Sequence, residues 1–348
     1  MAPGLIDTDA PQPSSTGVKR SIFPDGLKTT GQQPPSEDYR NNPELWTHEF
    51  SADEIAEISV AADTFINNGT PLTGITKSNF PLPKFSNRLE ELRKDLLDGK
   101  GFWLFRGLPV VEWDLQKSAT AYMGLGTYLG YFVSQNGKGH VLGHVKDLGE
   151  DPTKSDRVRI YRTNARQYFH TDGSDIVGLL CIAKSMSGGE SDIASTHHLF
   201  NVLQERHPDV VQTLCEPNWY FDRKGEVSEG EEGWIRGSIF YLENDRSSNP
   251  RVYARFDPMN VTSLARFNSG PNACIPPLSE KQKYAMEVFE KTCGELALHM
   301  ILAPGDIQFL SNSQSEGGWK LPYSDSLEKK RGGIQVNDTP PVCPLDAE

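Results

Sequence analysis

The stretch FHTDGSDIVGLLCIAKSMSGGES, residues 169–191, joins a polar loop to an apolar run and a glycine-containing turn. Within it, His170 and Asp172 flank a single residue. On a strand or at its exit, residues i and i+2 point to the same side, so these two side chains can converge on one ion. An imidazole and a carboxylate suit Fe(II), and two histidines plus one carboxylate form the non-haem iron arrangement. The alternative is structural, with Asp172 capping an Asp-Gly turn and His170 an ordinary, partly buried histidine.

Segments with helical spacing lie on both sides of this stretch. Apolar residues recur at helical intervals over 51–69, 87–98, 115–130, 195–214 and 279–300, and Ser51 and Ser279 are cap candidates. Pro208 should break the fourth of these helices. Short apolar or aromatic runs predict strands within 101–110, 131–135, 159–164, 175–183, 237–244, 251–256 and 302–312.

The order of these elements indicates the fold class. Many short strands, with helices concentrated before and after them, favour an α+β fold around a β-sandwich or jelly roll. The regular alternation of a doubly wound parallel sheet is absent, as are a G-x-G-x-x-G sequence after a strand and a Walker A sequence. Residues 1–45 are rich in Pro, Gly, Ser and Thr and lack periodicity, which predicts a mostly disordered arm.

Bulk properties narrow the class of partner. The net charge of −12 disfavours nucleic acid, because phosphate binding needs a basic face. No run of 18 apolar residues predicts a membrane span, and the N-terminus does not have the pattern of a secretory signal. The five cysteines are scattered and odd in number, which favours a reducing cytoplasmic compartment over a disulfide framework or structural zinc.

The surroundings of the triplet carry a resemblance. Residues 159–195, together with GKGFWLFRGLPV (99–110), YFVSQNGKGHVLGHVKD (131–147), the 197–214 helix and LAPGDIQFLSN (302–312), are similar to the TauD/TfdA family of Fe(II)- and 2-oxoglutarate-dependent oxygenases. The resemblance covers roughly residues 45–312, and it is to fungal members of the family above all. It implies a double-stranded β-helix, or jelly-roll, core with flanking helices over residues 46–335, followed by a flexible tail over 336–348.

The resemblance also implies the chemistry and its residues. His170 and Asp172 would begin the metal site, and Ser191, in the Gly-Gly-x-Ser turn, would contact 2-oxoglutarate. Gln135 and Arg255 match further positions where contact with cosubstrate or another anion is expected. The implied reaction uses Fe(II), 2-oxoglutarate and O2 to hydroxylate or desaturate a small organic acid or secondary metabolite, with succinate and CO2 as coproducts. The partner would be a small molecule, and a homo-oligomer stays open.

The third metal ligand is missing from its expected place. The family pattern puts a second histidine shortly after LAPGDIQFLSN, and then an arginine whose fork suits a carboxylate. Here no histidine follows His299, and Arg331 is the only arginine in the tail. Three explanations are open: an inactive jelly-roll protein that binds a ligand or partner, a gene-model error near 313–322 and after 331, or a substitute ligand such as Glu316 or Asp325.

Other charged side chains are weighed against ordinary roles. Arg162 and Arg166 precede His170 and could meet an anionic substrate, but pairing with surface acids is the favoured reading. His299 lies at the end of the helix predicted over 279–300, where a cation is favourable. A metal-binding cupin-like protein is a weaker third hypothesis, because the jelly roll also serves other metal chemistry.

Overall fold

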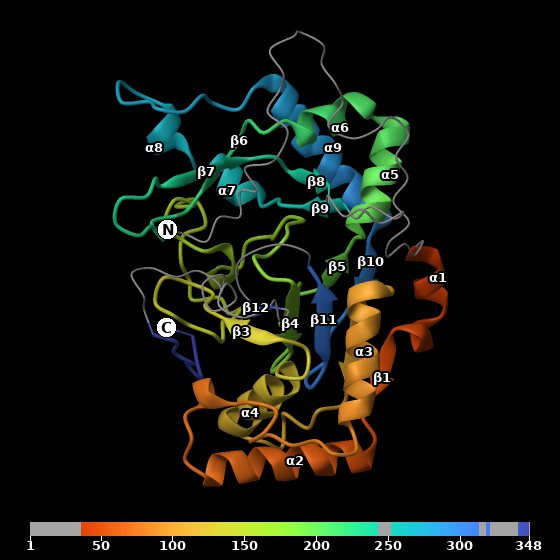
Figure 1. The fold of residues 1–348 in the computed structure, drawn as a ribbon. Coiled ribbons are helices and arrows are strands. Elements are labelled where there is room, and N and C mark those ends of the chain that lie inside the picture. Colours follow the sequence, from red (N-terminus) through yellow and green to blue (C-terminus); the bar gives the residue numbers. More distant parts are fainter. Residues whose placement is uncertain (1–35, 243–251, 313–317, 321–339, 348) are drawn as a thin grey trace. The chain divides into compact units, whose positions relative to one another are not determined.

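The computed structural model describes residues 36–242, 252–312, 318–320 and 340–347. The chain divides into two compact units, which we treat separately. Unit 1 comprises residues 144–171 and 193–297 together with the N-terminal 1–33, and unit 2 comprises 34–143, 172–192 and 298–348. Figure 1 labels their elements. The combination of helices with several separate sheets confirms the α+β class.

Unit 2 is built around a six-stranded mixed sheet in the order β1-β2-β11-β4-β12-β3. Its strands are β1 (Thr47–Glu49), β2 (Phe102–Arg106), β3 (Tyr131–Val133), β4 (Ile176–Leu180), β11 (Ile307–Ser311) and β12 (Gly318–Lys320). β11 pairs antiparallel with both β2 and β4, so Phe309 lies opposite Trp103 on one side and Gly178 on the other. A separate pair joins β10 (Leu298–Met300) to β5 (Ser191–Ile193).

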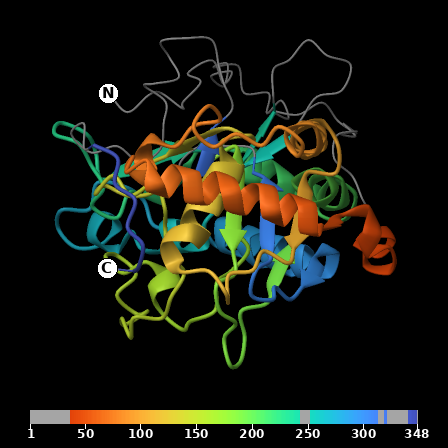
Figure 2. The same ribbon diagram turned by 90° about the horizontal axis from the view of Figure 1, so that it is seen from below.

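The helices of unit 2 are α1 (Ser36–Asn41), α2 (Ala52–Asn67), α3 (Ser86–Asp98) and α4 (Leu115–Gly126), with short 3-10 turns at Pro43–Leu45 and Leu72–Gly74. The last three follow the predicted apolar spacing. Ser51 and Glu54 form the capping box that starts α2. α2 and α4 pack against each other at one end of the sheet (Figure 2). Buried faces of α2, α3 and α4 form one core with side chains of β2, β4 and β11.

Unit 1 has a second core formed by helices and two hairpin-like pairs of strands. Its helices are α5 (Thr196–Arg206), α6 (Pro208–Cys215), α7 (Pro258–Thr262), α8 (Ala265–Asn268) and α9 (Glu280–Leu296), and a 3-10 turn lies at Ile160–Arg162. β6 (Trp219–Asp222) pairs with β7 (Trp234–Gly237), and β8 (Phe240–Leu242) pairs with β9 (Val252–Ala254). Pro208 breaks the helix between α5 and α6 as predicted.

Two expectations about local structure need correction. Residues 159–164 form a 3-10 turn instead of a strand, because Thr163 closes it with its N–H and hydroxyl on the Ile160 carbonyl. The disordered arm does not extend to residue 45: α1 precedes Trp46, whose indole N–H donates to the Tyr39 carbonyl at 2.8 Å. Residues 1–35 lie outside the described part of the chain.

The C-terminal segment is also more structured than the expected flexible tail. Val342 donates its N–H to the Gly139 carbonyl and accepts from the Val141 N–H, both at 2.8 Å. Cys343 packs against the core of unit 2. In addition, β12 pairs with β3 and β4 where the sequence shows no convincing closing strand. Residues 336–339 are outside the described ranges.

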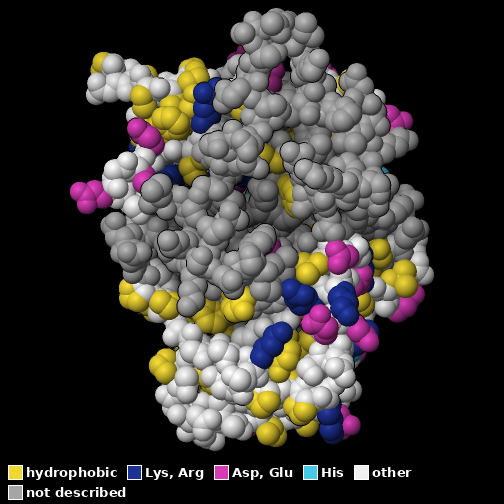
Figure 3. Space-filling view, in the orientation of Figure 1, with side chains coloured by type: hydrophobic (Ala, Val, Ile, Leu, Met, Phe, Trp, Pro, Cys, Tyr) yellow, Lys and Arg dark blue, Asp and Glu magenta, His cyan; other side chains and the backbone are white. Residues whose placement is uncertain are grey.

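Within the described ranges, no helix has the length and apolar character that crossing a bilayer requires. Figure 3 shows acidic and basic side chains intermixed over the face that carries α3. On α3, Arg88 pairs with Glu91 and Arg93 with Glu90, so these cations are matched by acids from the same helix.

Candidate active site

His170 lies in an extended loop of unit 1, and its side chain is exposed. Its Nδ1 is 2.7 Å from the Tyr168 carbonyl oxygen. A carbonyl can only accept, so Nδ1 carries a proton, and in the neutral ring the lone pair that can bind a metal is then on Nε2. Metal-binding histidines usually hold their ring in this way, with the second nitrogen donating to a carbonyl or carboxylate. The geometry at His170 therefore fits the role of a metal ligand.

The loop before His170 is tied to helix α9. The carboxylate of Glu290 accepts the Phe169 N–H at 3.0 Å and the Arg166 guanidinium at 2.9 Å. Burial raises the pKa of Glu290, while the Phe169 N–H, Arg166 and the charge of His170 each lower it. Glu290 was not a candidate from the sequence, where it is one of several acidic residues on a helix.

The two arginines before His170 pair with acids, which confirms the favoured reading. Arg166 binds Glu290, and Arg162 lies 2.8 Å from Glu150. Their guanidinium groups are therefore already matched by carboxylates within unit 1. An anionic substrate would have to compete with these ion pairs.

Thr171, between the two candidate ligands, is fixed by Phe256 at the end of the β9 segment. Its N–H donates to the Phe256 carbonyl at 2.6 Å, and its hydroxyl accepts the Phe256 N–H at 2.8 Å. These bonds join residues 85 positions apart in the sequence. Together with Glu290, they anchor the backbone on both sides of His170 within unit 1.

Asp172 begins the next segment of unit 2, and its side chain is exposed. Its carbonyl accepts a hydrogen bond of 2.6 Å from the Asn312 side-chain amide, which also donates to the Ser174 carbonyl at 2.9 Å. Asn312 ends the LAPGDIQFLSN stretch, but its residue type alone does not show that its amide reaches this turn. A neutral imidazole and a carboxylate two residues apart suit a borderline divalent ion.

Ser191 and Gln135 have protein partners of their own in unit 2. The Ser191 hydroxyl exchanges hydrogen bonds of 3.0–3.2 Å with the amide of Gln308, a buried residue of β11. The Gln135 amide donates to the Val141 carbonyl at 3.0 Å and so supports its own loop. Gln308 was not a candidate from the sequence, where the apolar run around it predicts only a strand.

Arg255 follows β9 in unit 1 and is half-buried. Its guanidinium carbon lies 5.0 Å from the centre of the Phe221 ring, within cation–π distance. Its positive charge also lowers the pKa of Tyr241, against the larger raising effect of burial. In the described part of unit 1, no carboxylate forms an ion pair with Arg255. It is therefore the best-placed of the predicted residues to receive an anion.

The third metal ligand is not found among the described residues. No group of three or more His, Cys, Asp or Glu side chains that could hold a metal is present in that part of the chain. The substitute ligands Glu316 and Asp325, and the tail arginine Arg331, lie outside it. The Nδ1 of His299 lies 2.8 Å from a carboxylate oxygen of Asp192.

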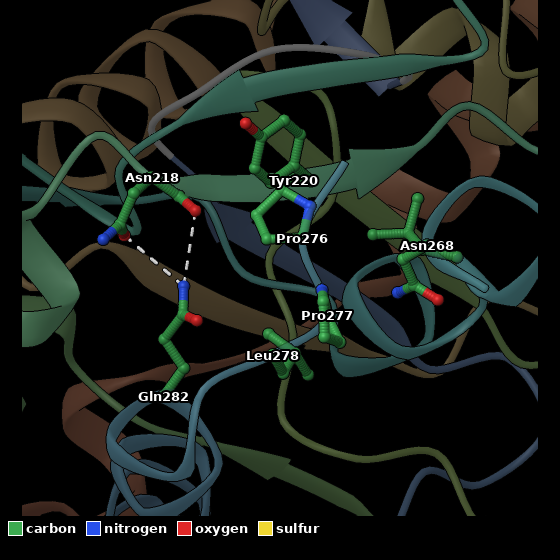
Figure 4. A pocket seen from close by; sticks show the side chains of 8 residues that line it. Asn218, Tyr220, Asn268, Pro276, Pro277, Leu278 and Gln282 are labelled. Carbon is green, nitrogen blue, oxygen red and sulfur yellow. Dashed lines mark hydrogen bonds between the residues drawn. The ribbon is translucent and has the colours of Figure 1, made fainter. Parts of the chain in front are cut away.

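A pocket in unit 1 involves none of the predicted residues. Figure 4 shows it, and it is lined by Asn218, Tyr220, Leu264, Asn268, Pro276, Pro277, Leu278 and Gln282. The Gln282 amide donates to both oxygens of Asn218, at 3.3–3.4 Å, and its oxygen belongs to the capping box of α9. The polar wall of this pocket therefore already has a structural role.

Sequence comparisons place the chain among dioxygenases. The model of the taurine catabolism dioxygenase TauD, TfdA family matches residues 68–315. FR-33289 synthase of Streptomyces rubellomurinus is 28% identical over 270 residues, 77% of this chain and 76% of that protein. The taurine hydroxylase-like protein SAT17 of Stachybotrys chartarum is 26% identical over 269 residues, 76% of this chain and 67% of that protein.

Solved structures support the same fold. An asparagine oxygenase in complex with Fe(II), 3-hydroxyasparagine and succinate superposes with a TM-score of 0.54 at 16% identity, over 81% of this chain and 90% of that one. The non-haem iron oxygenase OrfP in complex with Fe gives 0.50 at 12% identity, over 80% and 89%. The chain belongs to the taurine catabolism dioxygenase TauD, TfdA family, and it is an oxygenase that depends on Fe(II) and 2-oxoglutarate.

Proposed function

We propose that this oxygenase hydroxylates or desaturates a small organic acid or secondary metabolite, with succinate and CO2 as coproducts. Bound iron would supply the oxygen chemistry. The names of the relatives support a small substrate: one is a synthase, one is taurine hydroxylase-like, and one solved neighbour is bound to hydroxyasparagine and succinate. The comparisons favour this reading over the inactive binding protein. We also propose a jelly-roll core and a cytoplasmic location.

The hydrogen bond from His170 to the Tyr168 carbonyl is the observation that carries the proposal. This hydrogen bond supports a neutral ring with its proton on Nδ1, in which Nε2 would be the nitrogen that binds iron. Asp172 would add a carboxylate oxygen from two residues further along the chain. We propose these two residues as the iron ligands, with Glu316 or Asp325 as the third.

Three further residues would contact the cosubstrate. Ser191 presents a half-exposed hydroxyl whose direction is set by the buried amide of Gln308. Gln135 keeps its side-chain oxygen toward Gly143, so that oxygen is positioned by the packing of its loop. Arg255 offers a half-buried guanidinium that a carboxylate can match bidentately. We propose that Arg255 replaces the missing tail arginine as the main anion contact.

Succinate formation tests the function. The purified chain, given 2-oxoglutarate, Fe(II), ascorbate and O2, should release succinate, and His170→Ala or Asp172→Ala should reduce this at least about 100-fold, because each removes an iron ligand. His299→Ala is the matched control, since His299 pairs with Asp192. Absence of succinate from the wild-type chain with every candidate substrate would sink the proposal.

The third ligand needs a separate experiment. Anaerobic Fe(II) titration should show one bound iron per chain. One of the two variants, Glu316→Ala or Asp325→Ala, should bind iron more weakly than the other, because only one of these carboxylates would be the third ligand. Equal affinity in both variants and the wild type would eliminate these two carboxylates. Sequencing of the transcript addresses the gene-model alternative, because a message that encodes this tail removes that explanation.

A further inference from the structure

Asn312 connects the central strand of unit 2 to the turn that carries Asp172. The register of β11 on β4 pairs Leu310 with Val177 and Ser311 with Ile176, so Asn312 lies opposite Asp175, where strand pairing ends. The Asn312 backbone N–H continues the ladder with a 2.7 Å bond to the Asp175 carbonyl. Its position is therefore set by a strand that is paired on both edges.

The side-chain amide of Asn312 then extends past the end of the ladder. One amide nitrogen donates to the Asp172 carbonyl at 2.6 Å and to the Ser174 carbonyl at 2.9 Å. An amide NH2 has two protons, so both of its donors are used on this turn. Ser174 strengthens the arrangement, because its buried hydroxyl donates to the Ile176 carbonyl at 2.9 Å.

The two carbonyls held by Asn312 lie on either side of Gly173. Glycine has the widest conformational freedom of any residue, so a ligand followed by glycine is poorly fixed by its own backbone. Asn312 closes this weak point, because it holds the residues before and after Gly173 at once. With the turn held, the direction of the Cα–Cβ bond of Asp172 is held as well.

We propose that Asn312 is a positioning residue for the iron ligand Asp172. This inference rests on the proposed function, because it assumes that the Asp172 carboxylate binds iron. Asn312 would act through Asp172, since both of its amide protons are bonded to the backbone carbonyls of the Asp172 turn. Its contribution is to align Asp172 before the metal arrives, so that metal binding does not have to order the turn.

Two substitutions separate positioning from general stability. Asn312→Asp keeps the shape but replaces the donors with acceptors that face two carbonyl oxygens. Asn312→Ala removes the bonds without adding charge, and it serves if the first variant does not fold. Asn79→Asp is the matched control, because the Asn79 amide clamps another loop of unit 2, donating to the Gly74 carbonyl at 2.9 Å and accepting from the Thr76 N–H at 2.7 Å.

Metal affinity of the folded full-length chain is the readout. Anaerobic titration with Fe(II), and with Co(II) followed by its visible absorption, should show affinity about 10–100-fold lower for Asn312→Asp and Asn312→Ala. The Co(II) spectrum of the variants should also differ from the wild type, because the geometry at the metal changes. Asn79→Asp should lower the melting temperature but keep wild-type metal affinity and spectrum.

The outcomes distinguish this inference from the proposed function. Wild-type binding with unchanged affinity and spectrum in both Asn312 variants would overturn the positioning role and leave the function standing. A lower melting temperature with unchanged metal affinity and spectrum would mean that Asn312 only stabilises the fold, as Asn79 does. No metal binding by the wild-type chain would overturn the proposed function first, and the inference with it.

Discussion

Thr171 shows how a residue between two candidate ligands can position both of its neighbours. From the sequence it is a spacer, and only its place in His-x-Asp matters. In the structure its N–H and hydroxyl both engage Phe256, so the backbone between the candidate ligands is fixed by a residue 85 positions away. Asn312 acts in the same way on Asp172 and Ser174, and Glu290 acts on Phe169, just before the triplet. The two candidate ligands could be picked out from the sequence, and the residues that support them could not.

Glu290 gives a prediction at this scale. Glu290→Ala removes the acceptor of the Phe169 N–H, so the loop that orients His170 loosens and Fe(II) affinity of the folded chain should fall about 10-fold. Glu290→Gln should recover part of the affinity, since its amide oxygen can still accept that N–H. Glu295→Gln is the control, because Glu295 is on the same helix but pairs with Arg206. Equal affinities in all three variants would contradict the role of Glu290.

Elements were predictable where the signal is local. Helices α2 and α9 begin at serine caps with a partner three residues on, and their apolar faces follow the helical period. The strand predicted over 159–164 was wrong, because the Thr163 hydroxyl bonds to the Ile160 carbonyl and so stabilises a turn instead of an extended strand. Strand β12 was not predicted, because it forms through its pairing with β3 and β4. A segment of three residues is too short to show a strand pattern in the sequence.

Tyr128, in the turn that follows α4, should contribute to the stability of unit 2. Its buried hydroxyl donates to the Phe80 carbonyl at 3.0 Å and accepts the Leu82 N–H at 2.8 Å. Tyr128→Phe leaves both backbone groups unsatisfied, so the free energy of unfolding should fall by about 1–3 kcal/mol. Chemical denaturation of both proteins at neutral pH measures this difference.

The same side chain should make stability depend on pH. Burial raises the pKa of Tyr128 above its ordinary value of 10.0, so the folded state holds the phenolic proton more tightly than the unfolded state. The stabilisation is therefore complete below pH 10 and is lost as pH rises through the higher folded pKa. The stability gap between wild type and Tyr128→Phe should narrow above pH 10. A gap that stays constant to pH 11 would contradict this account.

At the scale of the whole chain, two cores form from segments that alternate along the sequence. Unit 2 takes residues 34–143, 172–192 and 298–348, and the two segments between these ranges belong to unit 1. The resemblance predicted one oxygenase domain over residues 46–335. The family model matches residues 68–315, which confirms the family, and the boundaries at 46 and 335 stay a prediction. The C-terminal segment belongs to the fold of unit 2, because Val342 completes a hydrogen-bonded pair with the 139–141 loop.

Cys343 offers a test of this docking. Burial raises the pKa of its thiol to about 11, whereas Cys274 is exposed. Since the thiolate is the reactive form, iodoacetamide at pH 8 should alkylate Cys274 well before Cys343, as followed by mass spectrometry of peptides. Denaturant should equalise the two rates. Equal rates in the native protein would show that the segment around Cys343 is not held against unit 2.

The sequence by itself determined the types of residue and the local elements: a His-x-Asp triplet, an apolar strand after it, capped helices, and a family likeness that the comparisons confirm. Tertiary structure alone decided which residues hold that triplet. Phe256 and Asn312 reach it across 85 and 140 positions, and Glu290 reaches Phe169, the residue before it, across 121. Hydrogen bonds between such distant residues leave no periodic trace in the sequence, because an acid on a helix or an amide at a strand end is equally compatible with a solvent-facing role.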